Sequence, residues 1–280
     1  MNKEEIRNTD QILHSFAEWL MDQNKSDSTA KTYVGVLSQF FQWMKEEIEE
    51  IESTHVQAYL DYMDDSNKSA GTIEKHYTAI TVFSRFLNKP EIMANIDRKA
   101  KEKKDEPPES LEPAEQSALI KEVEDEGNVR NIAIVYVLLH TGIRVSELCE
   151  LNHTDIKKDG ERESILIRDS KGEIERVIPL SRAASEHIKR YKDSLKAENE
   201  AVFLSSVNQR MTPRAVQYML SKYDVSPHKL RHTFCQNLID KGIEIQTVSK
   251  LVGHKDLNMT KRYIKESGQG LDAAIQNTFD

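Results

Sequence analysis

The sequence predicts a mainly α-helical protein of two domains, with a small antiparallel β-sheet in the second domain. Apolar residues recur at helical spacing through most of the 280 residues. Only two β-rich runs stand out, at 163–168 and 174–180, and the turn residues between them indicate a hairpin. A polar, charged linker at 98–112, with two consecutive prolines, separates an N-terminal domain, 1–97, from a C-terminal domain, 113–280.

Four helices are predicted in the N-terminal domain. The first carries Ile12 and Phe16 on one apolar stripe. The other three are expected to begin at or just after Ser28, Ser53 and Ser69, because serine is a preferred helix N-cap. The aromatic and aliphatic stripes of these helices indicate a packed helical bundle.

Helices are also predicted on both sides of the hairpin in the C-terminal domain. One helix begins at Pro113, and the strongly apolar stretch 132–139 indicates a deeply buried helix that ends at Gly142. A third short strand is expected at 201–204, and Thr212 followed by proline predicts the start of a further helix.

The stretch 226–264 carries most of the chemistry. Ser226 with Pro227 predicts a strong helix start, since serine caps the helix and proline suits its first position. A second short helix is expected to end at Gly253, directly before His254, and a third helical segment carries Tyr263. His228 and Arg231 lie three residues apart in the first turns of the opening helix. Two imidazoles, a guanidinium and a phenol at successive helix ends suit the binding of a phosphate.

These residues resemble the tyrosine recombinases, also called the phage integrase family. HKLRHTF, then LVGH, then a tyrosine nine residues later match the C-terminal signature of that family. The family also has an upstream arginine, found here in TGIRVSEL, and a hairpin lysine, found here in SKGEIERVIPL. The six matched positions, in family order, are Arg144, Lys171, His228, Arg231, His254 and Tyr263.

The resemblance implies that four of these residues bind the phosphate. Arg144 and Arg231 offer planar guanidiniums that match phosphate oxygens, and His228 and His254 can add hydrogen-bond donors. Glu147, three residues after Arg144, is expected to orient its guanidinium.

The remaining two residues are expected to form and break bonds. The resemblance implies that Tyr263 attacks the phosphate and forms a 3′-phosphotyrosyl intermediate, and neighbouring cations are expected to favour its phenolate. Lys171, at the hairpin turn, is expected to protonate the leaving 5′ oxygen. The phosphotyrosyl bond conserves the energy of the broken one, so no ATP, metal or other cofactor is expected.

The implied activity is site-specific recombination of double-stranded DNA through a Holliday junction, by a homotetramer on two duplexes that is monomeric in free solution. The implied role is resolution or integration of a mobile element or replicon, in a compact member without an additional arm-binding domain. The N-terminal bundle would be the SAM-like core-binding domain, which clamps DNA. Its candidate phosphate contacts are Lys31, Lys68, Thr72 and Lys75.

An apolar stripe also lies near the C-terminus. Leu271, Ile275 and Phe279 follow a glycine-containing hinge at helical spacing. A helix this short needs a surface on which to dock, either on its own domain or, as the resemblance implies, on a neighbouring subunit.

Composition limits the other possibilities. A net charge of −8 is unusual for a DNA-binding protein, although a local basic face is sufficient for binding. No apolar run is long enough to span a bilayer and the N-terminus is no signal peptide, so we expect a cytoplasmic protein with no membrane partner. The two cysteines, Cys149 and Cys235, are expected to be reduced and buried.

Three alternatives remain open at this point. A type IB topoisomerase shares the tyrosine nucleophile, and a DNA-binding relative could have lost its activity. His228, His232 and Cys235 have spacing compatible with a metal on one helix, although Arg231 would lie beside the ion. Otherwise His232 is expected to pack beside Phe234.

Overall fold

The chain divides into two compact units, Met1–Lys104 and Asp105–Asp280. A computed structural model describes residues 3–45, 48–98, 108–169, 171–195, 199–254 and 256–263. Each unit has its own hydrophobic core, so each is described separately.

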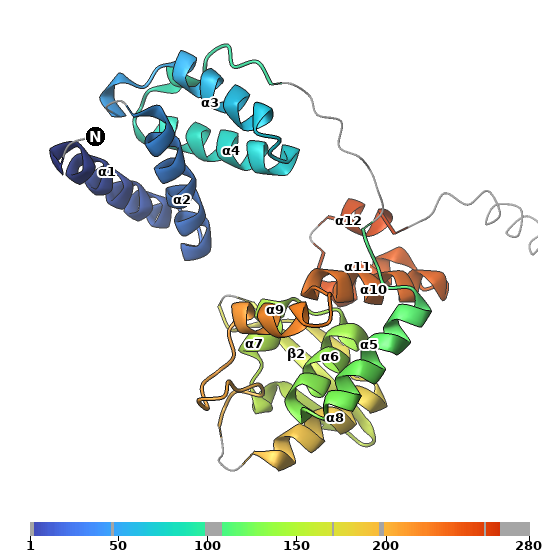
Figure 1. The fold of residues 1–280 in the computed structure, drawn as a ribbon. Helices are drawn as coiled ribbons and strands as arrows, with labels where there is room; N and C mark the ends of the chain where they lie inside the picture. Colours follow the sequence, from blue (N-terminus) through green and yellow to red (C-terminus); the bar gives the residue numbers. More distant parts are fainter. Residues whose placement is uncertain are drawn as a thin grey trace, which may run out of the picture. The chain divides into compact units, whose positions relative to one another are not determined.

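The N-terminal unit is a bundle of four α-helices, as predicted (Figure 1). The helices are α1 (Lys3–Asp22), α2 (Asp27–Met44), α3 (Ser53–Asp65) and α4 (Ala70–Phe86), with 3-10 turns η1 (Ile48–Glu50) and η2 (Pro90–Met93). The side chains of Phe16, Phe40 and Phe83 are fully buried between them. Ser26, rather than Ser28, is the N-cap of α2, and its hydroxyl accepts from the backbone N–H of Thr29.

The C-terminal unit is built around α6. Its helices are α5 (Pro113–Glu126), α6 (Val129–Thr141), α7 (Val145–Glu150), α8 (Arg182–Ser194), α9 (Pro213–Ser221), α10 (Pro227–Asp240), α11 (Ile245–Val252) and α12 (Asn258–Lys261), with the 3-10 turn η3 (His153–Asp155). Helices α5, α8 and α10 pack against α6, and the side chains of Ile134, Val135 and Leu138 on α6 are fully buried. The predicted deep burial of the 132–139 stretch is confirmed.

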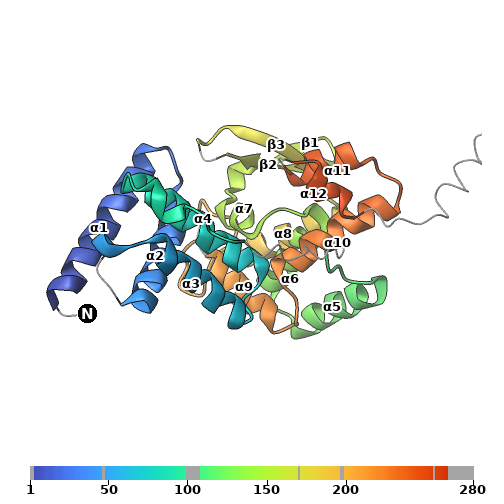
Figure 2. The same cartoon turned by 90° about the horizontal axis from the view of Figure 1, so that it is seen from above.

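The sheet has three antiparallel strands, β1 (Ile156–Asp159), β2 (Arg162–Arg168) and β3 (Ile174–Pro179), in that order (Figure 2). Ile165 on β2 is paired with Ile178 on β3, which confirms the predicted hairpin. The prediction of a strand at 201–204 is wrong, because Ala201 and Leu204 make only isolated bridges. The two bridges lead to different loops, so no continuous ladder forms there.

The end of α6 and the start of α10 are set by local sequence signals, and both lie next to the candidate site residues. Gly142 ends α6 with φ +61°, and a Cβ at this position would lie 2.3 Å from Cδ1 of Phe234. Glycine is therefore required both by the left-handed backbone and by the close approach of α10. At the start of α10, the Ser226 hydroxyl accepts from the backbone N–H of Lys229, which confirms the predicted cap.

Three expectations concern the chain as a whole. Cys149 and Cys235 are both buried and free. None of the helices in the described part of the chain has the length and apolar character that crossing a membrane requires. The apolar stripe of Leu271, Ile275 and Phe279 lies outside the described residues.

Candidate active site

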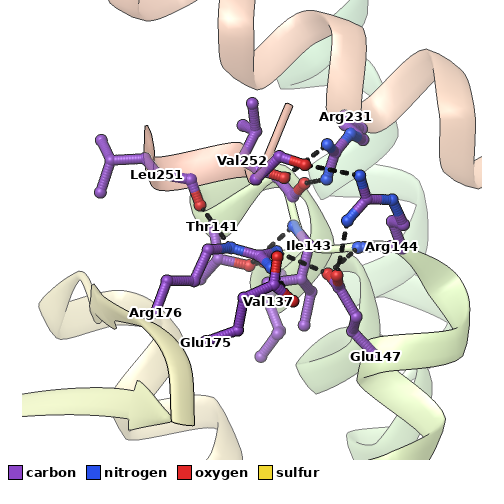
Figure 3. A network of polar contacts seen from close by, with 12 residues as sticks. Val137, Thr141, Ile143, Arg144, Glu147, Glu175, Arg176, Arg231, Leu251 and Val252 are labelled. Atoms are coloured by element: carbon purple, nitrogen blue, oxygen red, sulfur yellow. Dashed lines mark hydrogen bonds and ion pairs between the residues drawn. The ribbon is translucent and has the colours of Figure 1, made fainter. Parts of the chain in front are cut away.

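The C-terminal end of α11 presents three successive backbone carbonyls, and each accepts a hydrogen bond from a different arginine (Figure 3). The pairs are Arg176 Nε to Leu251 O at 2.9 Å, Arg231 Nη2 to Val252 O at 2.6 Å, and Arg144 Nη2 to Gly253 O at 2.7 Å. Cations at a helix C-terminus are favoured by the helix dipole. We call these three arginines, together with Glu147, the arginine cluster.

The carbonyls of α11 that the arginines leave free are satisfied by backbone groups. Gly253, in the left-handed conformation at φ +68°, donates its N–H to the Lys250 carbonyl, and the N–H of His254 donates to the Ser249 carbonyl. All acceptors at this helix end are therefore paired, and the arginines supply the donors that the backbone cannot.

Arg231 is the most deeply placed member of the cluster. It projects from α10 with 6% of its surface exposed, and its Nη1 donates to the Gly142 carbonyl at 2.6 Å. Burial, and then the neighbouring Arg144, lower the pKa of Arg231 to about 10. The guanidinium therefore stays charged at neutral pH.

Arg144 is the N-cap residue of α7, and its side chain is 40% exposed. Its Nη1 donates to Glu147 Oε1 at 2.7 Å, and its backbone N–H donates to Glu147 Oε2. Burial of Glu147 opposes ionisation, but the hydrogen bonds from Arg176 and Arg144 outweigh it and hold the carboxyl pKa below its usual range. Glu147 is therefore an ionised partner of Arg144, in the geometry that the sequence suggested.

His254 directly follows Gly253, whose carbonyl Arg144 binds. Its Nδ1 lies 2.8 Å from the Thr260 hydroxyl. Burial, and then Arg231 and Arg144, lower its pKa to about 4, so the ring is neutral at physiological pH. When the Thr260 hydroxyl donates to Nδ1, the ring proton resides on Nε2, which becomes a donor.

Tyr263 follows α12 in the chain, with 1% of its surface exposed. Its ring packs with Cys235, Val248 and Val252, and its hydroxyl lies 2.5 Å from Nδ1 of His232. Burial, and then Cys235, raise the pKa of Tyr263 well above its usual range. Arg231 acts in the opposite direction but more weakly, so the expected stabilisation of the phenolate by cations is not found in this conformation.

His232 makes a contact that the sequence does not indicate. It was expected to pack beside Phe234, yet it contacts the Tyr263 hydroxyl, and Gln236 one turn later donates to the Tyr263 carbonyl at 3.4 Å. Burial, and then His228, lower the pKa of His232 to about 4. His232 and Gln236, two polar residues at i and i+4 on the packed face of α10, are the sequence pattern that could have indicated this contact. We call Tyr263, His232, Cys235 and Gln236 the tyrosine shelf.

Two of the six candidate residues are exposed. His228 lies in the first turn of α10, with its ring centroid 6.4 Å from that of His232. Lys171 lies in the hairpin turn, where its backbone N–H donates to Asp169 Oδ1 at 2.8 Å. Arg144, Arg231 and His254 thus gather at the end of α11, Tyr263 lies on the shelf, and His228 and Lys171 face solvent.

The other candidate contacts are placed as follows. In the part of the chain that the structure describes, no three His, Cys, Asp or Glu side chains are grouped to hold a metal, and His232 is engaged with Tyr263 instead. Among the candidate DNA contacts, Lys31 pairs with Asp27 on α2, and Thr72 bonds the Ser69 hydroxyl at the start of α4. Lys68 and Lys75 are exposed near the same end of α4.

Comparisons with known proteins agree with this architecture. The model of the phage integrase family matches residues 109–269, and that of the phage integrase N-terminal SAM-like domain matches residues 12–93. Tyrosine recombinase XerA of Pyrococcus horikoshii is 30% identical, over 98% of this chain and 95% of its own.

Solved structures share the fold at lower identity. XerH bound to its difH substrate is 16% identical, over 100% of this chain and 90% of that one, with a TM-score of 0.72. A lambda integrase dimer bound to a COC′ core site is 20% identical, over 92% of this chain and 77% of that one, with a TM-score of 0.70. With its C-terminal model matched over more than half of the sequence and XerA similar along nearly all of it, the chain belongs to the phage integrase family, the tyrosine recombinases.

Proposed function

We propose that Arg144 and Arg231 of the arginine cluster bind the scissile phosphate of DNA and that Tyr263 attacks it, in a site-specific recombinase that cleaves and rejoins DNA. The observation that carries this proposal is the convergence of Arg144 and Arg231 on neighbouring carbonyls, Val252 and Gly253. Guanidiniums held in place before the reaction stabilise the charge that develops on the phosphate oxygens. Removal of one such donor typically costs about 3–4 kcal/mol of transition-state stabilisation. His254 and His228 supply further donors.

The reaction exchanges one phosphate ester for another. The Tyr263 hydroxyl releases its proton to solvent and its oxygen forms a bond to phosphorus; the bond from phosphorus to the 5′ oxygen breaks, and Lys171 gives a proton to that oxygen. In the reverse direction, a 5′ hydroxyl from the partner strand attacks the phosphotyrosine and releases Tyr263. No electrons are transferred, and the number of phosphate ester bonds is unchanged.

The raised pKa of Tyr263 supports a resting state in the free protein. The phenol is neutral, buried and held by His232, whereas the attack needs a hydroxyl that faces phosphorus. We infer that DNA binding moves Tyr263 off the tyrosine shelf and toward Arg231, where the cation favours loss of the proton.

The partners follow from the same reaction. Relatives in this family have been crystallised on DNA recombination sites, one of them as a dimer on its core site. We propose that this chain is a monomer in free solution and a homotetramer on two duplexes, with the N-terminal bundle as a clamp on DNA. Lys31, Lys68, Thr72 and Lys75 are its candidate phosphate contacts, and resolution or integration of a mobile element or replicon is the proposed role.

A nicked suicide substrate tests the nucleophile. Once the tyrosine has attacked, the short 5′ fragment is lost and an SDS-stable protein–DNA adduct accumulates. Tyr263→Phe removes one oxygen and is expected to reduce the adduct to background, while gel-shift binding of DNA is retained. A normal adduct from this variant would show that Tyr263 is not the nucleophile.

A second substrate tests the proton donor. Lys171→Ala is expected to slow cleavage by about 10²-fold or more, because the leaving oxygen lacks a general acid. A bridging 5′ sulfur needs no protonation and should restore most of the rate. If the sulfur leaves the variant slow, Lys171 has another role.

A further inference from the structure

Arg176 is the one arginine of the cluster that has no part in the proposed reaction. It lies on β3, the strand that follows the hairpin turn with Lys171. Only 8% of its side chain is exposed, compared with 40% for Arg144. Arg231 is just as buried, at 6%, but Arg176 is not one of the six candidate positions, and its guanidinium is held between α11 and α7.

The guanidinium of Arg176 joins three elements. Nε donates to the Leu251 carbonyl on α11 at 2.9 Å, and Nη2 donates to Glu147 Oε2 on α7 at 2.7 Å (Figure 3). The other oxygen of the same carboxylate accepts from Arg144 Nη1. The position of Arg144 therefore depends, through Glu147, on a residue of β3.

Arg176 also packs against Gly253. A Cβ on Gly253 would lie 2.8 Å from Arg176 Nη1 and 2.9 Å from Cζ, so the guanidinium rests directly on the glycine. The carbonyl of this glycine is the one that Arg144 binds, and the next residue is His254. One guanidinium thus contacts the carboxylate that binds Arg144 and the glycine whose carbonyl Arg144 binds.

Folding stability alone does not favour this arrangement. Nη1 of Arg176 is buried and has no hydrogen-bond acceptor among the described residues, with only the Glu175 carboxylate 3.6 Å away. A buried donor without an acceptor is destabilising, and such groups in native proteins require an explanation.

We propose that Arg176 is a positioning residue for the recombination reaction, which sets Arg144 through Glu147 and sets Gly253 and His254 through the end of α11. This inference rests on the proposed function, in which Arg144 binds the phosphate. Without Arg176, both oxygens of Glu147 are available to Arg144, and its guanidinium is drawn away from the Gly253 carbonyl.

The test measures single-turnover cleavage of the nicked suicide substrate. Arg176→Met is expected to lower the rate by about 100-fold, because small misplacements of a catalytic group have effects of this size. Arg176→Lys keeps the charge but cannot donate to Leu251 and Glu147 at once, and should lose roughly 10-fold or more. If Arg176→Met does not fold, as judged by circular dichroism and thermal unfolding, Arg176→Lys alone decides the outcome.

Arg210→Met is the matched control. Arg210 is also a partly buried guanidinium of this unit, and it donates to the Cys149 and Leu151 carbonyls and to Asn152 Oδ1, at the opposite end of α7 from Arg144. This variant is expected to lose stability but to keep the cleavage rate of its folded fraction within about 3-fold. Equal losses from Arg210→Met and Arg176→Met would reduce Arg176 to a structural residue and overturn the proposal.

Two further measurements test whether Arg176 acts through Arg144 and not through the proton donor Lys171. If Arg176 acts through Arg144, Arg176→Met should add at most about 3-fold to the loss caused by Arg144→Lys, since coupled residues are not additive. A bridging 5′ sulfur should rescue Lys171→Ala but not Arg176→Met. Full additivity, rescue by sulfur, or a wild-type rate would each overturn the proposal. Absence of any adduct from the wild-type protein would instead refute the proposed function.

Discussion

The arginine cluster and the tyrosine shelf both include residues of α10, and their functional groups differ in charge and in how they are held. In the cluster, Arg144 and Arg231 are charged and held by carbonyls and by Glu147. On the shelf, Tyr263 is buried, neutral and bound to His232. The proposed phosphate site is therefore preformed, whereas the proposed nucleophile is buried and neutral.

This difference has a physical basis. Guanidiniums keep their charge even when buried, and backbone carbonyls can hold them in place without neutralising them. A phenol in the same surroundings loses its ability to ionise, because burial disfavours the phenolate more than Arg231 favours it. Under the proposed function, the phosphate site is ready before DNA binds, and the position of Tyr263 controls the attack.

Replacing an arginine of the cluster is expected to have a larger effect on stability and cleavage than replacing a residue of the tyrosine shelf. Arg231→Met leaves the carbonyls of Gly142 and Val252 without a donor. It should lower the free energy of unfolding by about 1–3 kcal/mol and slow adduct formation by roughly 10²–10³-fold. Arg144→Met, at the 40% exposed position, should slow adduct formation to a similar extent with a smaller loss of stability. Chemical unfolding and suicide-substrate cleavage measure both quantities; equal stability losses would show that Arg231 is no more structural than Arg144.

A smaller effect is expected on the shelf. His232→Phe removes the hydrogen bond to Tyr263 and should lower the free energy of unfolding by about 0.5–1.5 kcal/mol. It should also increase the nitration of Tyr263 by tetranitromethane severalfold in the DNA-free protein, as mapped by mass spectrometry. His228→Phe, at the exposed neighbouring imidazole, is the matched control and should leave nitration unchanged. Unchanged nitration in His232→Phe would mean that this contact does not hold the tyrosine.

The two sites also share a dependence of stability on pH. The pKa values of His232 and His254 are both about 4 in the folded protein, below the usual value near 6.5 for an unfolded histidine. Between these values the unfolded chain binds more protons, so stability should fall as pH decreases from about 6.5 toward 4. Thermal unfolding across this range measures it, and either histidine replaced by asparagine should flatten the curve. A variant with an unaltered curve would contradict the role of that histidine.

Local features of the fold were predictable from the chain. Ser226 with Pro227 begins α10, and glycines end α6 and α11, because capping depends only on residues close in sequence. The hairpin followed from its turn residues and alternating strands, whereas the third strand was misplaced from 156–159 to 201–204. Both segments are short, and pairing decides between such segments more than composition does.

The sequence by itself determined the family and the identity of the six candidate residues, because these depend on residue types at fixed spacing. Only the tertiary structure decided that three arginines bind successive carbonyls of α11, that Arg176 points inward, and that Tyr263 rests on His232. Each of these contacts joins elements far apart in the chain. The packing of these elements decides which carbonyls lack a backbone donor. It also decides which side chains are buried away from solvent.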